Sequence, residues 1–411
     1  MVIISDNDKL QFYQYEVKDF YFTNKGSKTN ITGYKLNSFI VINDYIENIF
    51  PIIQIKVVMD SNTYYDIINN KDTVKVRLRI QKYTRKPGEQ QKSIKSSYID
   101  SSFKLILNDS DEDLYADIRK KNHNGKIDDE DLYEQANEIE FFLFRSDLIK
   151  ASKKKINRIF ESATVTDGIA YIASKIGIDD LLMSKSNNEK EYSPFIIPPL
   201  KATDAIQYID TFYGIYNVSS MLYFGIEASY LLRYEGKCTA YRHKEKKVVK
   251  IIIPKAGTKA SQNLCSLEKY DKRDCYYIIG NYENIQFEDQ TVTNNLTSGD
   301  NIHVIHANAK HPEVSAANLS NKKIIVNRGF NKWFEKIFKS KQNSLKKVIH
   351  VQFTDIDLDA LTPNKKFSFI FEDTKLNKKY KGTYILVRSE IGLIKVEKDL
   401  RASVKCVFTQ G

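Results

Sequence analysis

The sequence predicts a mainly β protein with α+β insertions, on three observations. Apolar residues alternate through short segments near both ends of the chain, aromatic residues are abundant, and a helical period appears mainly in the middle. The 26 Tyr and 22 Phe often stand beside β-branched residues, which favours sheet. With 42% hydrophobic and 28% charged residues, 411 residues suffice for two to four ordinary domains.

Residues 1–155 are predicted to form a first β-domain. Strands are expected at 39–42, 50–58, 74–80, 103–107 and 139–144, where apolar residues mostly occupy every second position. Residues 62–68 are predicted to form a single helical turn. The acidic segment 109–134 is predicted to be an exposed insertion.

Residues 156–188 are predicted to form a helical insert, because the apolar period changes to helical between 151 and 184. Thr166 is the predicted N-cap and Asp167 suits the positive start of the helix. Ile169 and Ile172 share one helix face, and Gly177 is the predicted left-handed stop.

Residues 189–240 are predicted to form a small α/β domain. Pro198 and Pro199 are expected to stop the structure that precedes them. A second helix then repeats the Thr-Asp cap, the apolar spacing and the glycine stop, with Thr203, Asp204, Ile206, Ile209, Phe212, Tyr213 and Gly214. Short strands are expected at 215–216, 221–224 and 229–232.

Residues 241–411 are predicted to form a second β-domain. Its expected strands are 248–253, 276–279, 323–326, 348–353, 366–372 and 382–388, with one amphipathic helix at 330–339. The N-terminus lacks a basic, apolar leader, and no apolar run approaches the length of a membrane span. We therefore expect neither secretion by a signal peptide nor a membrane span.

The formal net charge of +11 leaves a polyanion partner open, since phosphates are bound by Lys and Arg. However, an AT-rich genome also enriches Lys, Asn and Ile, and acidic residues are interleaved throughout the chain. A solvated surface is the favoured interpretation, and a basic nucleic-acid-binding protein is the alternative.

No metal or cofactor site is predicted. The four cysteines, Cys238, Cys265, Cys275 and Cys406, lack zinc or disulfide-framework spacing. A calcium loop from Lys120 to Asp131 would place a lysine at the first ligand position. The histidines His303, His306 and His311 are interpreted as surface residues, because strand neighbours three apart face opposite sides.

No catalytic motif is present, so no enzymatic activity is predicted. Asp355, Asp357 and Asp359 are predicted to form a row on one strand face, which is typical of a solvated surface. A glycosidase or peptidase acting through paired carboxylates is the enzyme alternative.

Several of these segments resemble the hub proteins of contractile phage tails, including the T4-type hub and its relatives in Mu-like phages and injection systems. The resemblance lies in residues 163–178, 198–200 and 205–216, and in Pro363, Gly382 and Tyr384 within residues 361–367 and 380–384. It implies two tail-tube-like β-barrel domains around the helical insert and the α/β domain.

The resemblance also implies a function. Such a hub is a structural trimer that joins the hexameric tail tube to the trimeric central spike, because two barrels in each of three chains imitate a six-membered ring. The implied partners are the tail tube, central spike, tape measure and baseplate wedge or other tail proteins, with DNA passing through the lumen. Asp355, Asp357 and Asp359 are possible lumen residues.

The implied location is the virion baseplate, after assembly in the host cytoplasm. The hub of a bacterial injection system or tailocin is an alternative.

Overall fold

The structure is a computed structural model, and it describes most of the chain. The described residues are 10–24, 27–30, 35–71, 73–85, 92–106, 137–178, 180–234, 248–255, 266–267, 275–280, 282–291, 302–306, 323–342, 345–396 and 399–410. The predicted acidic insertion at 109–134, the possible calcium loop, His311, Cys238 and Cys265 lie outside them.

Strands dominate this part of the chain, as predicted. They are β1 (Leu10–Asn24), β2 (Ser27–Asn30), β3 (Leu36–Asp44), β4 (Ile52–Met59), β5 (Lys75–Arg85), β6 (Lys92–Ile106), β7 (Asn137–Arg145), β8 (Lys155–Phe160), β9 (Leu181–Met183), β10 (Phe195–Lys201), β11 (Ser220–Phe224), β12 (Ser229–Arg233), β13 (Val248–Ile253), β14 (Ser266–Leu267), β15 (Cys275–Ile279), β16 (Ile285–Thr291), β17 (Ile302–His306), β18 (Lys323–Asn327), β19 (Leu345–Thr354), β20 (Lys366–Phe371), β21 (Thr383–Val396) and β22 (Asp399–Gln410).

Helices are few and short. They are α1 (Ser61–Asn69), α4 (Ser146–Lys153), α5 (Val165–Ile176), α6 (Ala202–Phe212), α8 (Phe334–Gln342) and α9 (Thr374–Tyr380), with 3-10 turns at η2 (Tyr282–Asn284) and η5 (Leu358–Ala360). The predicted fold class, mainly β with α+β insertions, is confirmed.

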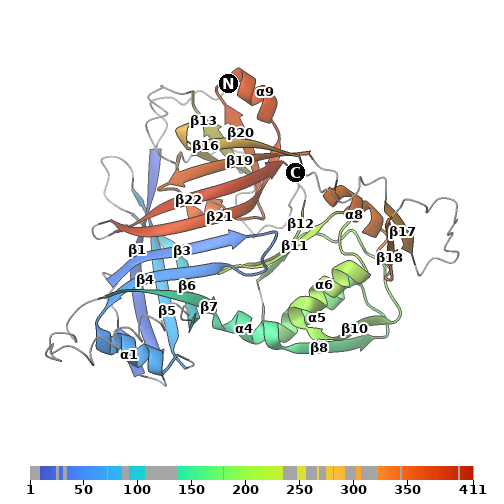
Figure 1. The fold of residues 1–411 in the computed structure, drawn as a ribbon, viewed down its shortest axis with the longest axis horizontal. Coiled ribbons are helices and arrows are strands. Elements are labelled where there is room, and N and C mark those ends of the chain that lie inside the picture. The colour runs from blue at the N-terminus through green and yellow to red at the C-terminus, as the bar shows by residue number, and fades with distance from the viewer. Residues whose placement is uncertain are drawn as a thin grey trace.

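Eight strands form a closed barrel in the order β21-β3-β4-β7-β6-β5-β1-β22, and pairing of β21 with β22 closes the ring. Figure 1 shows its blue and cyan strands beside the red C-terminal pair. Alternation explains the predicted strands, since Val76, Leu78 and Ile80 of β5 are buried while Arg77 and Arg79 lie toward the outside.

The sequence prediction missed β1, because a β-bulge interrupts its alternation. Tyr13 and Tyr15 are buried before the bulge, which lies between Val17 and Asp19, and Phe20 and Phe22 are buried after it. The buried set thus changes from odd to even positions within one strand, as an inserted residue requires.

A second group of strands shares β21 and β22 with the barrel. On one side, β20 pairs with β21 and is followed by β13 and β15, and on the other, β19 pairs with β22 and is followed by β16. Within the described residues the outer strands β15 and β16 do not pair with each other. We call this group the second sheet, and Figure 1 shows it above the barrel, with α9 at its upper end.

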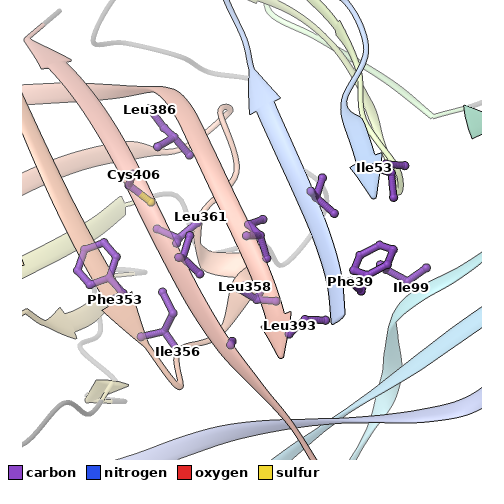
Figure 2. Close-up of a cluster of buried hydrophobic side chains, with 14 of the residues drawn as sticks. Phe39, Ile53, Ile99, Phe353, Ile356, Leu358, Leu361, Leu386, Leu393 and Cys406 are labelled. Atoms are coloured by element: carbon purple, nitrogen blue, oxygen red, sulfur yellow. The ribbon is translucent and has the colours of Figure 1, made fainter. Parts of the chain in front are cut away.

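The C-terminal hairpin therefore belongs to both bodies. In β21, residues 388–394 pair with β3 of the barrel, whereas Tyr384 pairs with Phe367 of the second sheet. A bulge between Leu386 and Arg388 marks the transition. Buried residues of both bodies form one continuous cluster, part of which Figure 2 shows from Phe39 and Ile53 of the barrel to Phe353 and Leu386.

The α/β unit, residues 146–234, has a core of its own in which α5 and α6 cover the β8–β10 ribbon. It is joined to the barrel by buried polar contacts. The Tyr223 hydroxyl donates to Asn43 Oδ1 (2.7 Å), and the Asn43 amide donates to Ser389 Oγ of β21 (2.9 Å). Figure 1 shows the unit to the right of the barrel, reached from β7 through α4.

Three local predictions in this unit are wrong. Residues 155–160 form strand β8 rather than part of a helical insert, and residues 215–216 are not a strand. Pro198 and Pro199 lie inside β10 instead of stopping it, and the register of β10 with β8 shifts between Ile197 and Leu200. A bulge tolerates prolines because it does not require their missing N–H groups.

The shared hairpin predicts a single unfolding transition. Leu393→Ala, in the barrel part, and Leu386→Ala, in the second-sheet part, should each lower the free energy of unfolding by about 2–5 kcal/mol, because each leaves a cavity in the common core. Ile394→Ala is the control, since Ile394 is 50% exposed on the other face of β21. Calorimetry showing two transitions, each moved by only one variant, contradicts a common core.

Candidate functional site at the barrel seam

The barrel is least regular where β1 meets β22, and we call this contact the barrel seam. Their register pairs only Tyr15 with Leu400. Beyond that point Asp355 lies between the strands, where its N–H donates to the Ala402 carbonyl (2.9 Å) and its carbonyl accepts from the Tyr13 N–H (3.1 Å). One residue of the β19–β20 connection therefore completes the ring.

Asp355 has a φ of 53°, which is uncommon outside glycine but is tolerated by Asp. This conformation turns the chain inward after β19. Ile356, Leu358 and Leu361 are then buried in the common core, where Figure 2 shows them between Phe353 and Leu393. The Tyr15 hydroxyl fixes this segment by donating to the Ile356 carbonyl and accepting from the Leu358 N–H, both at 3.0 Å.

A buried lysine holds the next two carboxylates. Lys82 Nζ lies 2.7 Å from Asp357 Oδ1 and 2.6 Å from Asp359 Oδ2, and its side chain is only 6% exposed. Lys82 continues the inward alternation of Val76, Leu78 and Ile80 in β5. Lys365 Nζ also donates to the Asp359 carbonyl, so two ammonium groups meet this turn.

Burial and the neighbouring charges have opposite effects on the pKa of Lys82. Burial alone would lower the pKa of Lys82, but Asp357 and Asp359 outweigh it and raise that pKa above its ordinary value. Burial, and then the Asp359 charge, raise the pKa of Asp357, although Lys82 opposes the rise. Burial also raises the pKa of Tyr15, which keeps its hydroxyl protonated as a donor.

The predicted row of carboxylates on one strand face is wrong. β19 ends at Thr354, and Asp357 is the N-cap of η5, where its side chain accepts from the Asp359 N–H. The Lys82 ammonium group lies between Asp357 and Asp359 and neutralises part of their charge, so the two carboxylates are not arranged as a general acid and a general base. The cluster instead holds the turn in place. The lumen-facing position of these carboxylates stays a prediction.

The predicted helix caps lie elsewhere. Thr164, not Thr166, is the N-cap of α5, and it forms a capping box with Asp167. The cap hydrogen bonds hold the pKa of Asp167 below its usual value. The N-cap of α6 is Lys201, without a side-chain cap bond, so Thr203 and Asp204 lie inside the helix. Both predicted N-caps therefore lie two residues after the observed ones.

The predicted helix faces and stops are confirmed. Ile169, Ile172, Ile206 and Ile209 are buried in the core of the α/β unit, together with Tyr213. Gly177 and Gly214 have left-handed φ values of 70° and 79°. Phe212 is half-buried and stacks on Tyr208.

Two asparagines that the sequence prediction missed complete the end of α6. The Asn188 amide donates to the Tyr213 and Gly214 carbonyls, and the Asn331 amide donates to the Asp210 carbonyl. A Cβ at Gly214 would lie 2.5 Å from Asn331 Oδ1, so glycine is needed there for space as well as for φ. No local pattern marks either asparagine, because both act on distant backbone.

The C-terminal residues of the predicted motif lie along the second sheet. Pro363 is buried after η5, and the Tyr384 hydroxyl donates to the Tyr380 carbonyl at the end of α9 (2.8 Å). Gly382 lies against Gln410, so the β21 start and the β22 end approach closely.

Four of the other candidate ligand residues lie in the described part of the chain. His303 and His306 lie in β17, Cys275 lies in β15, and Cys406 is a buried free thiol whose pKa is raised by burial. Across the described residues, no His, Cys, Asp and Glu side chains group as metal ligands. In the same residues, no helix is long and apolar enough to cross a bilayer.

Comparison with protein-family models decides the affiliation of the chain. The model described as bacteriophage PBS1 gene 109 protein matches residues 8–406. The chain belongs to this family. No curated protein matches the chain. The predicted relationship to phage proteins is thus confirmed for nearly the whole sequence.

Solved structures that resemble this chain include two tail proteins. A tail protein from Neisseria meningitidis MC58 is 11% identical, with 97% of each chain covered and a TM-score of 0.48. The 43 kDa tail protein of prophage MuSo2 from Shewanella oneidensis is 9% identical, with 94% of this chain and 96% of that one covered and a TM-score of 0.46.

A third similar structure is the E. coli c3393 protein, a type VI secretion component described as similar to the T4 tail proteins gp27 and gp5. It is 7% identical, with 94% of this chain and 76% of that one covered and a TM-score of 0.40.

The Lys82 cluster predicts a strongly asymmetric mutational response. Lys82→Met should lower the free energy of unfolding by about 3 kcal/mol, because Asp357 is left buried beside Asp359 without the ammonium group that pairs with it. The triple variant Lys82→Met, Asp357→Asn, Asp359→Asn should recover most of the loss. Lys405→Met is the control, since Lys405 is 62% exposed in its pair with Glu390 and should change stability by less than about 1 kcal/mol.

The pH dependence supplies the second measurement of this prediction. Because folding raises the pKa of Lys82, its contribution is complete below the unfolded value of about 10.4 and is lost as the pH rises through the folded value. Denaturant titrations should therefore show the difference in unfolding free energy between wild type and Lys82→Met narrowing as the pH rises above about 10.4. A constant difference between them argues against an ionic contribution.

The revised cap of α5 predicts a contrast between two nearby threonines. Thr164→Ala should lower the free energy of unfolding by about 1 kcal/mol, since it removes a cap bond to the Asp167 N–H. Thr166→Ala is the matched control and should be nearly neutral, because Thr166 is exposed in the first turn. Equal effects in thermal unfolding contradict the assignment of the cap.

Proposed function

We propose that this chain is the structural baseplate hub of a contractile phage tail. In this proposal a trimer joins the hexameric tail tube to the trimeric central spike and surrounds the channel for tape measure protein and DNA. Residues 1–155, completed by the β21–β22 hairpin, and residues 241–411 supply its two tube-like β-domains, and the chain itself has no catalytic role. Family membership supports the phage context, and the architecture supports the adaptor role.

The observation that carries the proposal is the shared C-terminal hairpin. Because β21 and β22 pair with strands of the barrel and of the second sheet, one chain presents two β-bodies in a fixed relationship. A hinge between them would let the angle vary from copy to copy, and a regular ring would not form. Three copies of a rigid pair supply six bodies around one axis, which matches both symmetries.

The carboxylates at the seam have unequal parts in this proposal. Asp357 is 17% exposed and bound to Lys82, so it mainly anchors the turn. Asp359 is 52% exposed, and its free surface is the part that could repel DNA phosphates if the turn faces the channel. The lumen role therefore rests on Asp359.

The mass in solution tests the proposal. Native mass spectrometry of the full chain should give three times the 47.7 kDa chain mass, and negative-stain images should show a ring with six lobes and a central hole. Interfaces of a permanent trimer should hide more than about 2,000 Å², so the trimer should persist on dilution.

A compact monomer at micromolar concentration, or an assembly without a hole, contradicts the hub proposal. The hub of a bacterial injection system or tailocin gives the same ring and differs only in the partners that purify with it. A basic nucleic-acid-binding protein should instead bind DNA as the isolated chain, with an affinity that falls steeply with added salt.

A further inference from the structure

The β8–β10 ribbon of the α/β unit has two chemically different faces. Ile156, Phe195 and Ile197 point inward and are 4% exposed or less. This inner face packs under α5 and α6, so tightly that a Cβ at Gly168 would lie 2.5 Å from Phe195. The helices therefore account for one face and leave the other to solvent.

The outer face combines apolar and basic side chains. Ile159 and Ile196 are directly opposite each other and are 69% and 39% exposed. Ile159 is the most exposed of the large apolar side chains in the described residues. Lys155 and Lys201 form the next outward pair in the register, and both are exposed. Neither strand contains a carboxylate.

This arrangement is unfavourable for an isolated ribbon. Like charges directly opposite each other across strands destabilise the pairing, and an exposed isoleucine pair gains nothing from burial. Lys153 and Lys154 immediately before β8 are also exposed and add to the positive charge. An anionic partner with apolar side chains would remove both costs at once.

Backbone geometry indicates how such a partner attaches. In the described residues β8 pairs only with β10, so its other edge is open. β10 contains Pro198 and Pro199, which lack N–H donors, whereas β8 contains no proline. Figure 1 shows the ribbon at the lower border of the molecule, below α5 and α6. Strand addition is therefore better suited to β8.

We propose that the outer face of the β8–β10 ribbon docks an extended acidic segment of another protein, which adds a strand to β8. Carboxylates of the partner face Lys155, with Lys201 one strand further on, and its apolar side chains pack against Ile159, with Ile196 one strand further on. An apolar centre with a charged border is typical of a protein interface, whereas a phosphate backbone would leave the isoleucines in water. This inference does not depend on the hub assignment.

A designed peptide tests the surface on the full-length protein. The probe is a fluorescent ten-residue peptide with isoleucine and aspartate four residues apart, so that both lie on one strand face. Lys155→Glu with Lys201→Glu should weaken its Kd at least tenfold, and Ile159→Thr with Ile196→Thr about fivefold. Lys185→Glu with Lys190→Glu makes the same charge change on exposed lysines outside the ribbon and should have a smaller effect.

One further variant separates binding from folding. Lys155→Glu alone converts a like-charge pair into an ion pair with Lys201, so the melting temperature should rise slightly while the peptide Kd weakens. Loss of binding that merely follows loss of structure cannot give this combination.

Two results overturn the inference. One is a peptide that fails to bind, or that binds wild type and the ribbon variants equally well. The other is a ten-nucleotide single strand that binds more tightly than the peptide and responds to the same lysine variants, which makes the face a nucleic-acid surface instead.

Discussion

The pairing of β21 with β22 constrains the rest of the structure. These long strands line the barrel with one half of their length and the second sheet with the other, and a bulge near Val387 adjusts the buried face between the halves. Because the same backbone ladder runs through both bodies, neither can turn relative to the other without breaking strand pairs. One continuous core then follows from one continuous hairpin.

The seam depends on this hairpin as well. β22 must diverge from β1 to reach the second sheet, and the divergence leaves backbone groups that need new partners. Asp355 supplies them in its left-handed conformation, and the turn that follows brings Asp357 to Lys82. The buried charges are thus tied to the geometry of a barrel that must open on one side to continue into a second sheet.

Sequence periodicity predicted several strands in which one face stays buried without interruption, but it missed β22, whose buried residues also alternate regularly from Leu400 to Phe408. β3, β4 and β5 alternate regularly and were found, whereas β1 was missed because its bulge changes the phase after Val17. The ion pairs at the seam could not be predicted for a different reason. Lys82 continues an inward alternation, but only the closed barrel shows that its partners lie more than 270 residues away.

Helix ends show the same limit at shorter range. Thr-Asp pairs suggested caps at Thr166 and Thr203, yet the capping box of α5 uses Thr164, and α6 begins directly from β10 at Lys201. Glycine stops were predictable because a left-handed residue is a local property, and both were found. The asparagines that support the end of α6 act on distant backbone, which no local pattern reveals.

The barrel and the second sheet form one frame, so the α/β unit attached to this frame is the part best placed to bind a partner. The α/β unit has its own core and is joined to the barrel through Tyr223, Asn43 and Ser389, which lie on β11, β3 and β21. Since β3 and β21 are paired, this buried contact fixes the unit to the hairpin itself. A partner bound at the distant β8–β10 ribbon would therefore be held at a defined position relative to both β-bodies.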